Sequence, residues 1–354
     1  MSEAGVSQPT LGVLIACRNE ARVIERRLRN LACSRWPEAP RPHQLVVIDD
    51  GSEDGSAALA RAACAACFDG AGVEARVVQS RRAPGKSGAL LQGLEELADR
   101  CDVVVSTDAD VLTGPQALLE IARAFGADAG LGMASGAQVF VRELAADGRV
   151  GATNGERGAA GLYDRITARV RALESRRGRL FSVHGQLLAW RASLGIVPRG
   201  LAADDLDLML QVRARGARTR LIETARFYEA KPRTEGEREG QALRRAQAYV
   251  QCMRALPALP IRLGQSGGLA RLQEQLYRRL PTAMPWLLVL ASAALPFAAW
   301  AWGGLRAGGV ALALTLVLAL SPPGRRLTDL MAIIVRAGRR ERRRPLSDRW
   351  ESAR

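Results

Sequence analysis

Residues 46–56 read VVIDDGSEDGS, an apolar run that ends on two carboxylates and then turns through glycine. Valine and isoleucine favour extended backbone, whereas aspartate, glycine and serine favour turns and helix N-termini. The stretch therefore predicts a buried β-strand that is followed at once by a helix, capped by Ser56 or Asp54. Taken alone, the same residues are equally consistent with a plain turn and helix cap, so their meaning depends on their surroundings.

The same strand-to-helix unit recurs on both sides of this stretch. Strands are predicted at residues 11–16, 44–48, 75–79 and 103–107, and helices at residues 21–31, 56–67 and 88–99. Short strands separated by helices of about ten residues predict a mostly parallel α/β sheet with helices on both faces. Ligands of such sheets bind at the carboxyl ends of the strands, which is where the polar residues of this chain gather.

Two acids, Asp108 and Asp110, follow the predicted strand at residues 103–107. Side chains at positions i and i+2 of an extended segment face the same side, so both carboxylates can converge on one cation. Mg²⁺ or Mn²⁺ held by one or two carboxylates, with a diphosphate completing its shell, is the usual arrangement in nucleotide chemistry. A helix cap after the strand explains one of these aspartates but not the pair.

Two further segments carry charged residues that suit the same chemistry. Residues 84–89 (PGKSGA) resemble a phosphate-binding loop only loosely, because Ser80 stands where the Walker motif requires glycine. This disfavours a kinase or ATPase, although Lys86 can still meet substrate charge. Asp204 and Asp205 open a predicted helix, where acids complement the helix dipole. A carboxylate held there can also act as general base toward an acceptor hydroxyl.

Taken in order, these segments resemble glycosyltransferase family 2, the inverting family with the GT-A (Rossmann-like) fold that includes cellulose, hyaluronan and chitin synthases. The likeness extends from about Leu11 to Trp350, and its main motifs are residues 18–20, 49–54, 85–90, 108–110 and 204–205. By this resemblance Asp50, with Asp49, holds the nucleoside, Asp108 meets ribose or metal, Asp110 ligates the metal, and Asp205, beside Asp204, is the base. Residues 174–176 and 185–191 look like the acceptor-side segment.

The resemblance implies a metal-assisted single displacement with inversion at the anomeric carbon. The donor is a nucleotide-diphosphate sugar, expected to be a UDP-sugar, and the acceptor is a hydroxyl group of a membrane-associated lipid or lipid-linked glycan. Gln241, Arg244 and Arg245 stand where processive members have Gln-x-x-Arg-Trp, so we expect them on the acceptor side. The chain departs from the family at two of these positions, where Asp204 replaces the more frequent glutamate and Arg245 replaces tryptophan.

The C-terminal part of the chain changes character. Leucines and arginines at helical spacing predict an amphipathic interfacial helix over residues 261–282, although a core-facing helix fits the same spacing. Residues 284–302 contain no charge and carry three tryptophans, as expected of a membrane span with interfacial aromatics. A shorter apolar run at 307–321 completes a predicted transmembrane hairpin over residues 283–323. Residues 324–354 then form a basic amphipathic segment.

Positive charge flanks the predicted hairpin on both sides. Two arginines precede it at residues 278–279 and two follow it at 325–326, whereas Arg306 alone lies between the spans. The positive-inside rule then places both ends in the cytosol. We therefore expect a multi-pass protein of the inner (plasma) membrane, with residues 1–260 forming a cytoplasmic catalytic domain. The apolar run before Arg18 is too short for a signal peptide and is interpreted as a strand.

The net charge of +15 raises nucleic acid as a partner, but the distribution of charge disfavours it. Only Lys86 and Lys231 are lysines among 51 basic residues, and the arginines are spread along the chain and thicken around the C-terminal apolar segments. An anionic lipid bilayer fits this pattern better. The alternative from another functional class is a catalytically inactive, membrane-tethered scaffold of the same fold that binds a partner enzyme or polymer.

Overall fold

The computed structural model describes residues 8–150, 162–230, 234–255 and 268–346 of the 354-residue chain. The chain forms two compact units, one of residues 1–231 with 347–354 and one of residues 232–346. The predicted catalytic domain, residues 1–260, thus extends past the first unit into the second. The predicted interfacial helix begins at residues 261–267, which lie outside the described part of the chain.

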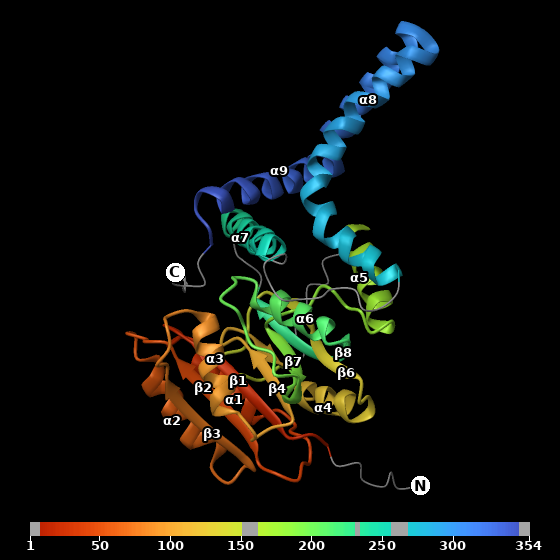
Figure 1. Ribbon diagram of the computed structural model, residues 1–354. Coiled ribbons are helices and arrows are strands. Elements are labelled where there is room, and N and C mark those ends of the chain that lie inside the picture. The colour runs from red at the N-terminus through yellow and green to blue at the C-terminus, as the bar shows by residue number, and fades with distance from the viewer. Residues whose placement is uncertain (1–7, 151–161, 231–233, 256–267, 347–354) are drawn as a thin grey trace. The chain divides into compact units, whose positions relative to one another are not determined.

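The first unit is built on an eight-stranded sheet with the order β3-β2-β1-β4-β7-β6-β8-β5 in its described residues (Figure 1). In chain order the strands are β1 (Leu11–Cys17), β2 (His43–Asp49), β3 (Val73–Gln79), β4 (Val103–Thr107), β5 (Leu112–Thr113), β6 (Leu131–Val141), β7 (Leu187–Arg191) and β8 (Arg218–Ala230). Pairs among β1 to β4 are parallel, as is β6 with β8, whereas β7 is antiparallel to both neighbours and β5 to β8. The prediction of a mostly parallel α/β sheet is confirmed.

Helices cover both faces of this sheet (Figure 1). They are α1 (Ile24–Ala32), α2 (Ser56–Phe68), α3 (Lys86–Glu96), α4 (Ala117–Ala127), α5 (Leu162–Arg176) and α6 (Asp204–Ala214), with a 3₁₀ turn at Ala192–Leu194. Alternate β1 residues, such as Val13 and Ile15, share one buried core with α1, α2 and α4. On the other face α3 lies so near β1 that a Cβ on Gly93 would stand 2.1 Å from Leu14 Cδ1. A larger residue at this position would force the side chain of Leu14 to shift.

Strand register brings the predicted site segments to one edge of the sheet. The parallel pairing sets Cys17 opposite Asp49, and Leu14 opposite Ser106. The carboxyl ends of β1, β2 and β4 therefore finish side by side. The loops that leave them carry the polar residues which the sequence analysis singled out.

The second unit consists of α7 (Glu235–Ala255), α8 (Gly268–Leu320) and α9 (Pro322–Arg343) in its described residues. Both α7 and α8 pack against α9. The buried Gln247 of α7 donates from Nε2 to Glu341 Oε2 at 2.8 Å and to the carbonyl of Arg344 at 3.0 Å. These bonds fix the C-terminal end of α9 on α7.

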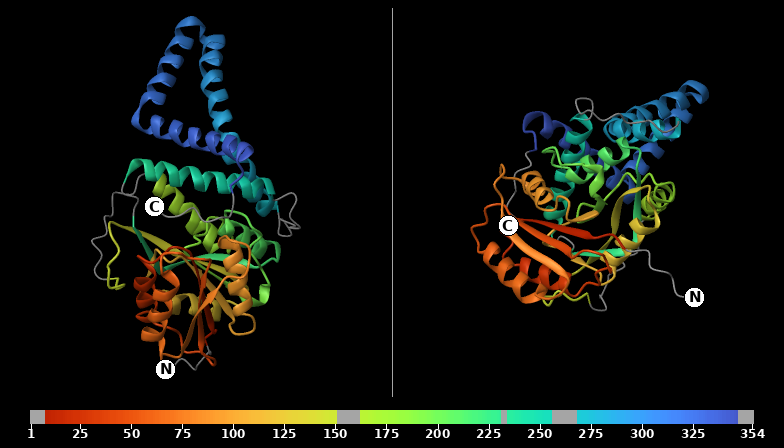
Figure 2. Two further views of the ribbon diagram at one scale, coloured as in Figure 1. Left: turned by 90° about the vertical axis from the view of Figure 1, so that its left-hand side faces the viewer. Right: turned by 60° about the horizontal axis from the view of Figure 1, so that its bottom comes forward.

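Helix α8 changes direction at Gly304, whose backbone is non-helical with φ 70° and ψ −168°. Figure 2 (left) shows the α8 ribbon turning back on itself. A Cβ on Gly308 would lie 2.6 Å from the Cβ of Trp300, so the residues after the turn lie against those before it. From Gly268 to the turn the helix continues through Pro281, Pro285 and Pro296.

The apolar side chains of α8 are largely uncovered in the structure. Trp302 is 95% exposed and Leu305 is 82% exposed. By length and composition, α8 is the one helix in the described part of the chain that could cross a membrane, over Leu272–Leu320. Large exposed apolar surfaces of this kind mark membrane or protein interaction sites.

Candidate active site

The loops after β1 and β2 are held together by hydrogen bonds at the carboxyl edge of the sheet. The backbone N–H of Asn19 donates to Ser52 Oγ at 3.0 Å, and that of Glu20 donates to Ser56 Oγ at 2.7 Å. The Asp54 carboxylate accepts from the N–H of Ser56 at 3.0 Å, at the start of α2. The side chains of Ser52, Asp54 and Ser56 therefore hold the two loops in place. The two aspartates at the end of β2, Asp49 and Asp50, are then available to the site.

Asp49 and Asp50 are buried, with 1% and 4% of their surface exposed. Asp50 Oδ2 accepts from the N–H of Gly85 at 2.8 Å and lies 3.7 Å from Arg18 Nη1. Asp49 Oδ2 accepts from the N–H of Ser52 at 3.3 Å, whereas its Oδ1 has no hydrogen-bond partner among the described residues. Because an unpartnered buried oxygen is costly, it fits a donor group of a ligand, such as a base N–H or a ribose hydroxyl.

Lys86 joins two acids that are distant in the sequence. Its Nζ lies 3.0 Å from Asp108 Oδ1, after β4, and 3.5 Å from Asp204 Oδ2, at the start of α6. The residue before Asp108 is also anchored, because Thr107 Oγ1 donates to the carbonyl of Gln186 at 2.7 Å. The structure thus brings together the segments around residues 86, 108, 186 and 204.

Asp205 is next to this ion-pair network. A Cβ on Gly185 would lie 3.6 Å from Asp205 Oδ2, so residues 185–191 begin beside this carboxylate and continue into β7. Asp205 Oδ1 accepts from the N–H of Leu206 at 2.7 Å. Burial, and then the negative charge of Asp204, raise the pKa of Asp205 to about 6. A carboxylate with this pKa is a stronger base than an ordinary aspartate and is still ionised at neutral pH.

Asp110 belongs to a group of acids that repel one another. Although the residue is accessible to solvent, burial of its carboxylate and the charges of Asp108 and Glu229 raise the pKa of Asp110 to about 6. Burial, with Asp110 and Asp108 nearby, raises the pKa of Glu20 to about 7. Glu229 reaches this site because Leu112 pairs with Tyr228, which places β8 beside the residues after β4. The site therefore holds more negative charge than Lys86 balances.

Such a site fits a hard divalent cation. Among the described residues, no three His, Cys, Asp or Glu side chains gather closely enough to enclose a metal ion. Asp108 and Asp110 would supply carboxylate ligands, and a diphosphate with water would complete the shell, as Mg²⁺ and Mn²⁺ sites for nucleotides require. A bound cation would also relieve the repulsion that raises the pKa of Asp110. The donor set is therefore that of Mg²⁺ or Mn²⁺.

Arg27 is a residue of this site that the sequence analysis missed. It is fully buried, and it donates from Nη2 to Thr107 Oγ1 at 2.8 Å and from Nη1 to Asn30 Oδ1 at 2.5 Å. Burial lowers the pKa of Arg27 to about 9, against the opposing effect of Asp108 and Asp110, so the side chain is charged at neutral pH. A signal existed: Arg27 follows Ile24 by three residues and therefore lies on the apolar stripe of α1.

The predicted acceptor residues belong to a different unit of the chain from these acids. Gln241, Arg244 and Arg245 lie on α7, in the second unit, where the two arginines are exposed. Their role on the acceptor side stays a prediction. In the segment at residues 174–176, Ser175 Oγ accepts from the N–H of Leu221 at 2.9 Å, so this residue fastens α5 to β8.

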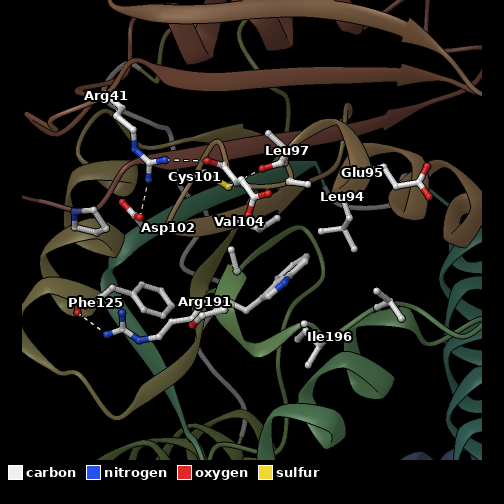
Figure 3. A pocket seen from close by; sticks show the side chains of 18 of the residues that line it. Arg41, Leu94, Glu95, Leu97, Cys101, Asp102, Val104, Phe125, Arg191 and Ile196 are labelled. Atoms are coloured by element: carbon white, nitrogen blue, oxygen red, sulfur yellow. Dashed lines mark hydrogen bonds and ion pairs between the residues drawn. The ribbon is translucent and has the colours of Figure 1, made fainter.

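A cavity of about 1070 Å³ lies at the opposite edge of the sheet, near the starts of β1 and β4 (Figure 3). Its two arginines are paired within the protein: Arg41 donates to the carboxylate of Asp102 at 2.8 Å, and Arg191 donates to the carbonyl of Phe125 at 2.8 Å. Of the predicted site residues, only Trp190 and Arg191, at the end of the segment at residues 185–191, line this cavity, and none of the predicted catalytic, donor-binding or metal-binding carboxylates does. The candidate site is therefore the acid cluster at the carboxyl edge, as expected for such sheets.

A family model described as "Glycosyltransferase like family 2" matches residues 9–248 of the chain. This range includes all the carboxylates of the site and the predicted acceptor residues. No curated protein matches the chain.

Several solved structures are similar to this one. The mannosyltransferase PcManGT from Pyrobaculum calidifontis, in complex with GDP-Man and Mn²⁺, has a TM-score of 0.67 and 26% identity, covering 95% of this chain and 87% of that one. Glucosyl-3-phosphoglycerate synthase from Mycobacterium tuberculosis, with Mn²⁺, UDP and glucosyl-3-phosphoglycerate, has a TM-score of 0.45 and 19% identity, covering 70% and 79%. The same synthase with Mg²⁺ and UDP has a TM-score of 0.43 and 18% identity, covering 70% of this chain and 79% of that one.

Proposed function

Because the chain belongs to glycosyltransferase-like family 2 and has the GT-A fold of its structural relatives, we propose that it transfers a hexose, with inversion, from a nucleoside-diphosphate sugar to a membrane-associated acceptor. The observation that carries the proposal is the convergence of Asp108, Asp204 and Asp205 on Lys86 and Gly185. These segments are far apart in the sequence and meet only at the carboxyl edge of the sheet.

Asp205 acts as general base in this proposal. Its carboxylate takes the proton of an acceptor hydroxyl while the hydroxyl oxygen forms a bond to the anomeric carbon. The bond from that carbon to the diphosphate oxygen breaks in the same step, and the nucleoside diphosphate leaves with the electron pair. Mg²⁺ or Mn²⁺, when bound at Asp110 and Asp108, would supply charge neutralisation for the departing diphosphate. Attack from the face opposite the leaving group inverts the anomeric configuration.

The donor is held, in this proposal, by the buried pair at the end of β2. Asp49 has a buried Oδ1 that lacks a partner in the described part of the chain, and Asp50 orders the loop before Lys86 through Gly85. UDP-sugars are the donors expected from the sequence resemblance. The relative from Pyrobaculum calidifontis is in complex with GDP-Man, which makes this donor an equal candidate.

Support for a membrane-associated acceptor comes from the second unit. The exposed apolar surface of α8 and the arginines of α9 suit a bilayer with anionic lipids. We infer that α8 enters the inner membrane as a hairpin that turns at Gly304, with both of its ends and the catalytic unit in the cytoplasm. Arg245, in place of the aromatic residue of processive members, favours the addition of one or a few sugars over a long polymer.

A donor panel tests this proposal. Full-length protein in detergent is heated with Mn²⁺ and UDP-glucose, UDP-galactose, UDP-N-acetylglucosamine or GDP-mannose, because a ligand that binds only the folded state raises the melting temperature. The stabilising donor is then incubated with lipid extract, and mass spectrometry of the lipids should show increments of one to a few sugars.

Two results would contradict the proposal. Stabilisation without transfer or donor hydrolysis would favour the inactive scaffold. A failure of every nucleotide sugar to stabilise the protein would reject the donor class itself.

A further inference from the structure

The second unit contains a small cavity that the proposed transfer reaction does not use. Its volume is about 170 Å³, and residues of α7, α8 and α9 line it. Arg254, Arg339 and Arg342 contribute the charged part of the lining, and Val250 and Ile334 contribute apolar wall. Trp286, which is 59% exposed, stands at the α8 side of the cavity.

The three arginines carry charge that the protein does not neutralise. None of them makes an ion pair in the part of the chain that the structure describes, and the cavity has no acidic residue in its lining. Arg336, one turn earlier on α9, is different because it pairs with Glu239 at 2.6 Å. All three are exposed, so they form the solvent-facing part of the lining, and three guanidinium groups without an acidic neighbour in the lining favour an anion there.

Guanidinium geometry and the apolar wall narrow the class of anion. The planar fork of arginine matches the paired oxygens of a phosphate. The volume is below the roughly 300–1,000 Å³ of sites that enclose a whole drug-sized ligand, so the cavity suits a headgroup better than a nucleotide sugar. Trp286 and the exposed apolar surface of α8 beside it form an apolar surface that the acyl chains of a lipid can contact.

We propose that this cavity binds the phosphate headgroup of an anionic phospholipid and so fixes α7, α9 and the part of α8 around Thr282 and Trp286 at the surface of the bilayer. The inference rests on the proposed membrane association but not on the identity of donor or acceptor. Basic pockets beside membrane helices bind lipid headgroups by the same chemistry.

The test compares two double variants of the full chain with the same change in charge. In Arg339→Gln/Arg342→Gln both cavity arginines of α9 are lost, whereas Arg340→Gln/Arg343→Gln removes their sequence neighbours, which point about 100° away around the helix and do not line the cavity. Dioctanoyl phosphatidylglycerol is titrated into each protein in neutral detergent, and binding is read by thermal shift and native mass spectrometry. The first variant should bind about thirtyfold more weakly than wild type, and the second as wild type does.

Equal weakening in both variants would show attraction by bulk charge only and would overturn the site. A third variant, Gly338→Leu, fills the cavity without changing the charge, and a Cβ there meets no atom within 4 Å. It should weaken binding while the melting temperature without lipid is kept.

The same titration with inorganic phosphate and with dioctanoylglycerol separates the sources of the ligand. Binding of free phosphate as tight as that of the lipid would overturn the assignment to a phospholipid, and tight binding of dioctanoylglycerol would overturn the role of phosphate. Stabilisation by nucleotide sugar and Mn²⁺, measured in every variant, reports the first unit separately. A failure of the lipid site is thereby distinguished from a failure of the proposed transfer.

Discussion

The two units of this chain use apolar residues in opposite ways. In the first unit, strand residues such as Val13 and Ile15 are completely buried between helices. In the second unit, Leu290 is 65% exposed and Trp302 is 95% exposed, although their helix is the one that is long and apolar enough to cross a membrane in the described residues. The first set packs against other residues of the chain, whereas the second set is largely uncovered in the described residues and, in the proposed function, meets the bilayer.

Charge follows the same division. At the acid cluster, Lys86 meets Asp108 and Asp204 within the protein. On α9, Arg339 and Arg342 have no such partner in the described part of the chain. The first unit therefore holds a built site for chemistry, and the second presents surfaces that need a partner. Variants that affect one unit and leave the other unchanged can test this separation.

The largest effect should come from Asp205→Asn. The amide cannot take the acceptor proton, and loss of a general base costs roughly 10²–10⁴ in rate. Because the base acts on the acceptor, thermal stabilisation by donor and Mn²⁺ should stay as in wild type, and the protein should remain in the membrane pellet. Initial rates of sugar transfer and the pellet assay together check this. Transfer at the wild-type rate would show that Asp205 is not the base.

A smaller effect is expected from Leu290→Arg in α8. An arginine at the centre of a membrane helix costs about 2.5–3.5 kcal/mol, whereas an exposed leucine of a soluble surface tolerates arginine. The matched control is Leu59→Arg on α2 of the first unit, where the leucine is 37% exposed. After a carbonate wash, Leu290→Arg should shift protein from pellet to supernatant, and Leu59→Arg should not. If both variants divide between pellet and supernatant in the same proportion, α8 does not hold the protein in the membrane, and the proposed difference between the two units is wrong.

Asp110→Asn should weaken Mn²⁺ binding roughly tenfold to a hundredfold, because it removes one ligand charge from an accessible position. Folding should be little affected, since the amide keeps the shape of the side chain. Electron paramagnetic resonance of free Mn²⁺ measures the affinity without any turnover. Glu53→Gln, at an exposed acid of the neighbouring loop, is the control and should bind Mn²⁺ as wild type does.

Sequence patterns predicted the parallel half of the sheet because each strand there is a continuous apolar run that ends on polar residues. β1, β2, β3 and β4 begin and end within two residues of their predicted bounds. The other half, which mixes antiparallel pairs with the parallel pair of β6 and β8, was not predicted strand by strand. Residues of β8 such as Arg218, Arg220 and Glu223 interrupt its apolar pattern, since this strand is only partly buried. The family resemblance, rather than periodicity, identified the segments on that side.

The site was predicted in part, for physical reasons that differ by residue. Asp108 and Asp110 could be found because two acids one residue apart at a strand end have few structural explanations. Glu229 could not, because only the pairing of β5 with β8 brings it to Asp110. Arg27 was hidden by the abundance of arginine in the chain, and only its helical position distinguishes it from the more accessible arginines of the same helix region.

The smallest effect concerns the dependence of the transfer rate on pH, on the acid side of its maximum (the acid limb). Asp205 must be deprotonated to act, and burial together with Asp204 raises its pKa to about 6, so the transfer rate should fall as the pH drops through this value. Asp204→Asn removes the neighbouring negative charge, and it also frees Lys86 from one of its two ion pairs. Both changes favour the ionised form of Asp205, which lowers its pKa by about one unit.

In Asp204→Asn, the acid limb should therefore move to lower pH. The transfer rate at pH 5, divided by the maximal rate of the same protein at higher pH, should be about five times the wild-type value. Rates are measured between pH 4.5 and 8 with saturating Mn²⁺, which keeps Asp110 ionised and out of the profile. Glu53→Gln again serves as the control, because removal of an exposed charge should leave the limb in place. An unchanged limb in Asp204→Asn would mean that another group titrates near pH 6. If Asp204→Asn loses all transfer while Asp205→Asn stays active, the general base is Asp204 and not Asp205.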